Sequence, residues 1–127
     1  MISALFNQPN YQAAQKLLDG TVLRHDAIAS NLANLETPNY KRLDVAPSFA
    51  VEMRQAMASG SPGQIAGVKP ELAVDSTAVS SKRDGNTVQL ESELVQLNKN
   101  LLAHTLETQL VSGNLLRLRL AITGRSN

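Results

Sequence analysis

Aliphatic residues in the last third of the chain, between Val88 and Arg125, recur in alternating steps of four and three. This seam consists of Leu90, Leu94, Leu97, Leu101, His104, Thr108, Val111, Leu115, Leu118 and Ile122. Eight of these ten positions are aliphatic, and the stretch contains no proline that would interrupt a helix. So sustained a repeat predicts one long helix of the coiled-coil type, about 55 Å in length.

A second line of leucines lies beside this seam and broadens the apolar part of the predicted helix. It consists of Leu102, Leu106, Leu110, Leu116 and Leu120. A two-stranded coiled coil needs only a narrow seam, whereas a broad stripe is typical of a helix that contacts several others. A chain of 127 residues cannot cover so long a helix alone, so we expect partner subunits to bury it. The alternative is the core helix of a small bundle.

The first part of the chain carries a weaker helical pattern from Tyr11 to about Leu35. Its seam consists of Leu18, Thr21, His25, Ile28, Leu32 and Leu35. Pro9 can occupy the first turn of this helix, and Pro38 biases the residue before it away from helical geometry. The helix is therefore expected to end at or before Glu36. Gly20 costs about 1 kcal/mol relative to Ala inside a helix, which predicts a kink or a helix start near Thr21.

Between the two helices the pattern is short and broken. Residues 43–46 are expected to be extended, and residues 48–57 to form a short amphipathic helix with Ser48 as its N-cap. Residues 58–86 are rich in Gly, Ser and Pro and predict a loop-rich connection, with a short strand at 71–75.

These patterns together predict a mainly α fold. Long N- and C-terminal helices pair as a coiled-coil-like hairpin, and a loop-rich middle segment carries short strands. The expected division is an N-terminal helix in residues 1–36, a middle segment in 37–87 and a C-terminal helix in 88–127.

Composition narrows the function classes. Aromatic residues make up only 3% of the chain, which leaves little material for a thick core. The net charge of +1 gives no electrostatic reason to expect nucleic-acid or anionic-membrane binding. The first residues lack the basic start and apolar core of a secretory signal peptide. We therefore expect the chain either to stay in the cytoplasm or to leave by a route that needs no cleaved signal.

Candidate chemistry is sparse, and we expect no catalytic residue, no cofactor and no metal. His25 and His104 both fall on seams, where packing is a better explanation than metal binding; their joint protonation at low pH is a further hypothesis. Glu91 and Glu93 are expected to complement the dipole of the long helix. Neither a nucleophile elbow nor a phosphate-binding loop occurs in the sequence.

The basic residues are few and scattered. The pair Lys41–Arg42 and the residues Arg117, Arg119 and Arg125 are expected to be solvated or interface charges. The alternative is that they form salt bridges to acidic residues of a neighbouring subunit.

One segment at the end of the first helix carries a specific resemblance. Its motif residues are Ser30, Asn31, Ala33, Asn34, Thr37, Pro38, Tyr40 and Lys41. Their order, S-N-x-A-N-x-x-T-P-x-Y-K, resembles the N-terminal signature of bacterial flagellar rod and hook proteins. Residues 84–91 and 115–125 are in turn similar to the small proximal-rod member of that family.

This resemblance implies a structural protein of the flagellar basal body. Such a subunit is exported unfolded through the flagellar type III apparatus, without a cleaved signal peptide, and assembles helically in the periplasm into a rod that transmits torque. The implied partners are other copies, other rod proteins, the basal rod adaptor, the export gate and the MS ring. Two alternatives stay open: the other small proximal-rod subunit, and a cytoplasmic coiled-coil adaptor or export chaperone.

Overall fold

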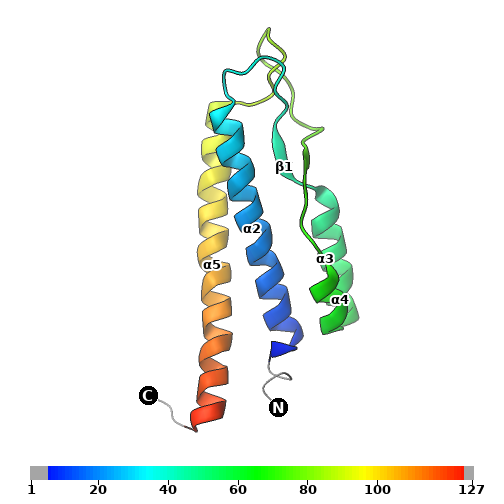
Figure 1. Ribbon diagram of the computed structural model, residues 1–127, viewed down its shortest axis with the longest axis vertical. Helices are drawn as coiled ribbons and strands as arrows, with labels where there is room; N and C mark the ends of the chain where they lie inside the picture. Colours follow the sequence, from blue (N-terminus) through cyan, green and yellow to red (C-terminus); the bar gives the residue numbers. More distant parts are fainter. Residues whose placement is uncertain (1–5, 125–127) are drawn as a thin grey trace.

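The computed structural model describes residues 6–124 and is dominated by two long antiparallel helices (Figure 1). The elements in chain order are α2 (Pro9–Ala33), β1 (Leu43–Val45), α3 (Pro47–Ser59), α4 (Pro62–Gly67), β2 (Leu72–Val74) and α5 (Leu90–Thr123). α5 lies along one side of α2, and the middle segment with β1, α3 and α4 lies along the other. The predicted mainly α fold, with paired terminal helices and a loop-rich middle, is confirmed.

α2 begins and ends where the prolines predict. Pro9 occupies its first turn, and the helix ends at Ala33, before Glu36. The alternative that the helix starts near Thr21 is wrong, because the helix is continuous through Gly20. A Cβ atom at Gly20 would lie 2.7 Å from Cε1 of Phe49 in α3. The glycine therefore allows α3 to pack closely against α2, at a cost in helix propensity.

The middle segment contains a small sheet and two short helices. β1 pairs antiparallel with β2, with Leu43 opposite Val74 and Val45 opposite Leu72, so both predicted extended pieces are strands. The predicted N-cap of α3 is wrong: Ala46 is the cap, and Pro47 occupies the first turn with a backbone angle already suited to a helix. α4 lies inside the region predicted to be a loop.

The hydrophobic core is small and lies between α2 and the middle segment. Its buried members are Ala13, Val45, Phe49, Met53, Ala56, Ile65 and Val68, with Leu17 and Leu23 packed against them. In the part of the chain that the structure describes, this cluster takes no residue from α5. The scarcity of aromatic residues is consistent with such a thin core.

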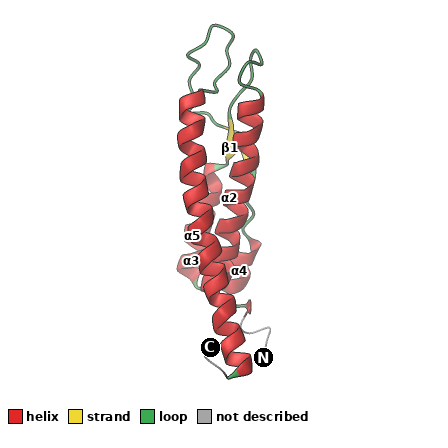
Figure 2. Ribbon diagram, turned by 90° about the vertical axis from the view of Figure 1, so that its left-hand side faces the viewer, coloured by secondary structure: helices red, strands yellow, loops and turns green. Residues whose placement is uncertain are grey.

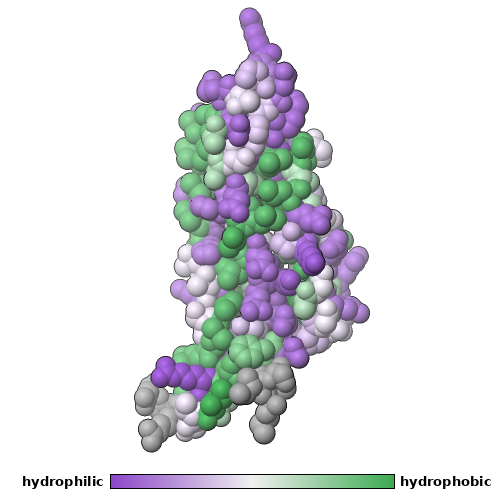
Figure 3. Space-filling model, viewed as in Figure 1, coloured by the Kyte–Doolittle hydropathy of each residue, from purple (hydrophilic) through white to green (hydrophobic). Residues whose placement is uncertain are grey.

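α5 contacts α2 along one face and is otherwise open. Of its 34 residues only Glu93 and Asn100 are buried, whereas most of its leucines are exposed. α5 is also longer than the 25-residue α2, and its last turns extend beyond the start of α2 (Figure 2). Hydrophobic residues form a band along the paired helices on the face shown in Figure 3. No helix within residues 6–124 is both long and apolar enough to cross a membrane.

Candidate assembly interface

The most deeply buried residue of the Ser-Asn motif is Asn31, whose side chain joins α2 to β1. Its Nδ2 atom donates to the carbonyl oxygen of Leu43 at 2.8 Å, and its Oδ1 atom accepts from the Leu43 amide at 2.9 Å. The amide group thus pairs with one residue of β1 as a neighbouring strand would. Removing it would leave buried polar atoms of the backbone without partners.

Other motif residues form the turn after α2. The Nδ2 atom of Asn34 donates to the carbonyl oxygen of Ser30 at 2.9 Å, and the Thr37 hydroxyl donates to Oδ1 of Asn34 at 3.1 Å. The hydroxyls of Ser30 and Tyr40 share a hydrogen bond of 3.0 Å. Ala33, Thr37, Pro38 and Lys41 are exposed. The polar part of the motif is therefore used within the chain, and the exposed part is free to contact a neighbour.

The second motif, residues 84–91, packs directly on the first. Nδ2 of Asn86 donates to the carbonyl oxygens of Asn34, Leu35 and Thr37 at distances of 2.8–3.1 Å. These carbonyl groups belong to the turn that follows α2, and Asn86 reaches them across about fifty residues of sequence. Lys41 in turn donates to the carbonyl oxygen of Gly85 at 2.8 Å. We call this assembly of residues 30–41 and 84–88 the motif junction.

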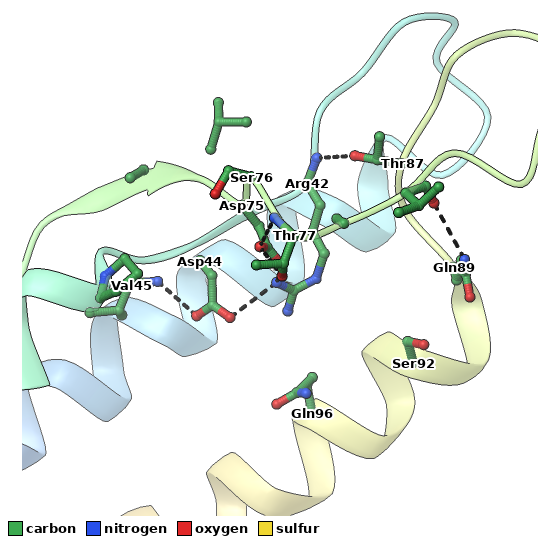
Figure 4. A pocket seen from close by; sticks show the side chains of 15 residues that line it. Arg42, Asp44, Val45, Asp75, Ser76, Thr77, Thr87, Gln89, Ser92 and Gln96 are labelled. Carbon is green, nitrogen blue, oxygen red and sulfur yellow. Dashed lines mark hydrogen bonds and ion pairs between the residues drawn. The ribbon is translucent and has the colours of Figure 1, made fainter.

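A buried charge network next to the motif junction connects the β1–β2 sheet to α5. The Nε atom of Arg42 forms an ion pair with Oε1 of Glu93. Its Nη1 atom contacts Asp44 at 3.0 Å and Asp75 at 2.8 Å (Figure 4). Arg24 adds a contact to Asp44 at 2.8 Å. The Glu93 side chain is completely buried, and its Oε2 atom accepts from Nδ2 of Asn31 at 3.2 Å.

One sequence interpretation needs correction here, and another was incomplete. Arg42 was expected to be a solvated or intersubunit charge, but it is buried and its carboxylate partners belong to its own chain. Glu93 lies in the first turn of α5, as its expected role beside the helix dipole requires, and it is also fully buried against Arg42. Periodicity could not reveal this pair, because the two residues lie 51 positions apart.

The electrostatics of the network favour its charged form. Burial by itself would raise the pKa of Asp44, but hydrogen bonds and charge from Arg24 and Arg42 outweigh burial and keep that pKa low. The hydrogen bond from the Thr77 hydroxyl is the main reason for the lowered pKa of Asp75. Burial likewise opposes the charge on Arg42, yet Glu93 and Asp44 raise its pKa. The network therefore stabilises the fold at neutral pH.

The fully buried residues on the face of α5 that meets α2 are polar, and the half-buried Leu97, Val111 and Leu118 lie between polar positions. Four residues of this face recur every seven positions: Glu93, Asn100, Glu107 and Asn114. Nδ2 of Asn100 donates to the carbonyl oxygen of Thr21 at 2.8 Å. Glu107 is half-buried, and burial raises its pKa. Polar residues along a helix pair specify its register at some cost in stability. The sequence contained this heptad signal, but the leucines beside it were more conspicuous.

The predicted seam residues are divided between covered and open positions. Ile28 is buried, and Leu18, Leu32, Leu97, Val111 and Leu118 are half-buried. The exposed members are Leu90, Leu94, Leu101, His104, Thr108, Leu115 and Ile122, and in the second line Leu102, Leu106, Leu110 and Leu116 are exposed. His25 is exposed, and Nδ1 of His104 lies 3.5 Å from the Thr21 hydroxyl. So large an exposed apolar surface is typical of a protein interface.

The cavities offer no evident chemistry. One cavity, of about 610 Å³, lies between residues 73–79 and the first turns of α5, where Ser92 and Gln96 face it (Figure 4). Its charged residues, Arg42, Asp44 and Asp75, are already paired with one another. Among residues 6–124 no group of three or more His, Cys, Asp or Glu side chains is arranged to hold a metal ion.

Comparison with known proteins agrees with the resemblance that the motifs carry. No protein-family model matches the chain. A flagellar basal body rod protein FlgB from Borrelia hermsii is 31% identical over 115 residues, which cover 76% of this chain and 83% of the relative. Proteins of the same name from Aquifex aeolicus and Salmonella typhimurium are 30% and 31% identical, covering 88% and 71% of this chain and 91% and 75% of the relatives.

Each of these relatives matches more than two thirds of this chain, and all three bear one name. The chain belongs to the family of the flagellar basal body rod protein FlgB.

Proposed function

We propose that this protein is a structural subunit of the proximal rod, assembled helically in the periplasm and able to transmit torque. Family membership supports the rod assignment. The observation that carries the proposal is the exposure of aliphatic side chains on both flanks of α5, while the only fully buried residues of this helix are the polar Glu93 and Asn100. A subunit inside a tube of helices would bury both flanks against neighbours.

Export through the flagellar type III apparatus is part of this proposal. A chain that passes an export channel unfolded must lose its tertiary structure at little cost. The small core, the polar residues buried between α2 and α5 and the absence of cysteine from the sequence all suit such a route. The mature location would be the periplasmic rod of the basal body.

We further propose that residues 1–36 and 88–127 belong to the helical core of the rod, and that residues 37–87 form the segment outside it. The partners would be other copies, other rod proteins, the basal rod adaptor, the export gate and the MS ring. The seam residues on α5, and the exposed motif residues Ala33, Thr37, Pro38 and Lys41, would make the contacts. The buried motif residues, above all Asn31, would hold the junction that presents them.

The substitution Leu101→Asp tests this function. Leu101 is exposed in the isolated chain, so its replacement should leave folding and export intact while placing a charge in the assembled core. Basal bodies isolated from the variant strain should lack the rod, and the cells should not swim. Val79→Asp is the matched control, because Val79 is exposed in a loop outside α5. Normal motility with Leu101→Asp would contradict the proposal.

A cytoplasmic coiled-coil adaptor would behave differently. Such a protein would cover the aliphatic flanks of α5 in a stable, soluble dimer. Sedimentation of the purified chain distinguishes the two functions, since a rod subunit should be largely monomeric in dilute solution and an adaptor should be a dimer. Imaging of the chain within an isolated basal body would then show its neighbours.

A further inference from the structure

The last turns of α5 extend beyond the start of α2, and Phe6, Gln8 and Tyr11 lie beside only their first part, near Leu115 and Leu118. α5 has nine more residues than α2, so at about 1.5 Å per residue roughly 13 Å of it extends beyond the pair. Leu115, Arg119 and Ile122 share one face there, at positions i, i+4 and i+7. All three are exposed, with 42% and 59% of the surface of Leu115 and Ile122 accessible. This spacing is typical of helices that bind in grooves.

A groove of suitable character lies on the same molecule, between α3 and the middle of α5. It has a volume of about 370 Å³, with Leu17 and Gly20 of α2 at its base. The α3 wall is apolar and includes Phe49, Met53 and Met57, and Ala103 forms part of the α5 wall. Methionine side chains adapt to the shape of what they contact. The groove could therefore accept aliphatic side chains of a helix.

Glu107 is the acidic residue that lines this groove, and it would favour an incoming cation. It lies on the α5 wall, and its Oε2 atom is buried without a hydrogen-bond donor among residues 6–124. The other charged groups that line the groove are Arg24, which is engaged by Asp44, and the exposed Arg54. A hydrogen bond from Thr21 and the charges of His104 and Arg24 lower the pKa of Glu107 but do not offset its burial. Because the Oε2 atom is covered, an incoming donor would satisfy it once the carboxylate turns toward the groove.

We infer that the groove of one copy receives the α5 end of a second copy. Leu115 and Ile122 of the second copy would contact the α3 wall, and the Arg119 guanidinium would donate to Glu107. Arg119 forms no ion pair within the described residues, so each copy carries both the unsatisfied donor and the unsatisfied acceptor. The inference rests on the proposed function, because it specifies one contact of the rod.

The geometry of this contact favours an open assembly. The two surfaces differ, so the interface is heterologous, and repeating it generates a ring or a helical file. Arg119 and Glu107 are twelve residues apart on α5, so parallel helices would be displaced by about 18 Å from copy to copy. Such a stagger links the end of one subunit to the middle of the next.

Disulfide cross-linking of the full chain tests the contact, since the chain has no cysteine of its own. A Met57→Cys chain is mixed with an Ile122→Cys chain at high concentration and oxidised. The mixed dimer should exceed the dimers that either chain forms alone, because only unlike surfaces meet. Val79→Cys mixed with Ile122→Cys is the control, since Val79 is 75% exposed but lies outside the groove. A yield equal to that control would overturn the inference.

Charge reversal sharpens the test. Arg119→Glu in the Ile122→Cys chain should lower the yield of mixed dimer about tenfold, and Glu107→Arg in the Met57→Cys chain should do the same. Combining the two reversed chains should restore the yield. Arg119 is exposed, so its reversal stays informative even if Glu107→Arg disturbs folding. An unchanged yield with Arg119→Glu would also overturn the inference.

The two proposals fail in different ways. If cross-linking does not exceed the control while Leu101→Asp still prevents rod formation, the groove assignment is wrong and the rod function stands. If Leu101→Asp leaves the rod intact, the proposed function itself is contradicted.

Discussion

Two regions of the molecule use polar and apolar residues in opposite ways: the motif junction with its charge network, and the C-terminal half of α5. In the motif junction and its charge network, which we call the head, polar side chains are buried and hydrogen-bonded, as with Asn31, Asn86 and Glu93. Toward the other end of α5, leucines such as Leu110 and Leu116 are exposed. Buried polar groups stabilise only the packing that satisfies their hydrogen bonds, whereas the burial of apolar surface stabilises a contact without fixing its direction. The head therefore fixes the shape of the subunit, and the C-terminal half of α5 is available for assembly.

The largest expected effect breaks the head. Glu93→Ala leaves Arg42 buried without its main partner, which should destabilise the isolated chain by about 3–5 kcal/mol. Urea unfolding followed by circular dichroism measures the loss. Glu91→Ala is the matched control, because Glu91 precedes Glu93 by two residues and is exposed. Comparable losses in the two variants would show that the ion pair does not hold the head.

Asn86→Ala tests the contact between the two motifs. Without Nδ2 of Asn86, three carbonyl groups in the turn after α2 each lose one of two donors, and the expected loss of stability is about 1–3 kcal/mol. Hydrogen exchange should also increase locally around residues 34–41. The exposed Asn98 on α5 offers an Asn→Ala control that should change neither quantity. Unaltered exchange at the end of α2 would argue against a structural role for the junction.

Acid should weaken the head by a smaller amount, because Asp44 and Asp75 keep partial access to water. Their pKa values are lowered in the folded chain, so the unfolded chain binds more protons as the pH falls. Their stabilisation is complete above the ordinary Asp pKa of about 3.9 and is lost below it. Thermal unfolding as a function of pH should show this decline, and Asp44→Asn should flatten it.

Protonation of Glu107 should change the stability of the fold in the opposite direction. Its raised pKa means that the folded chain takes up the proton more readily, so protonation in mildly acidic solution should stabilise the fold slightly. Glu107→Gln should abolish that gain. A steeper acid loss in Glu107→Gln than in the unchanged chain would agree with this direction, whereas identical pH profiles would contradict it.

The smallest effect on the isolated chain is expected on the exposed flank of α5. Leu101→Ala should change stability by no more than about 0.5 kcal/mol, because the side chain is exposed. The buried Ile28 provides the comparison, since Ile28→Ala should cost about 2–5 kcal/mol. Both are measured by urea unfolding of dilute protein. A large loss with Leu101→Ala would mean that α5 is covered in the monomer, and the contrast between the head and the exposed flank of α5 would disappear.

Much of the local structure followed from the sequence. Pro9 and Pro38 restrict the backbone next to them, so both ends of α2 were predictable from local chemistry alone. The continuous aliphatic repeat likewise predicted α5. Ser48 and Gly20 were misjudged, because Pro47 is a better helix start and Phe49 needs the space above Gly20. In the second case a contact from another helix outweighed the local preference.

The sequence by itself determined that this chain has two long helices, a thin core and more apolar helix surface than 127 residues can cover, because periodicity and composition are local properties. Only the tertiary structure decided that α5 turns Glu93 and Asn100 toward α2, and that the motifs around Asn31 and Asn86 meet. Several faces of α5 could have packed on α2. The choice depended on partners such as Arg42, which become neighbours only when distant segments of the chain are brought together.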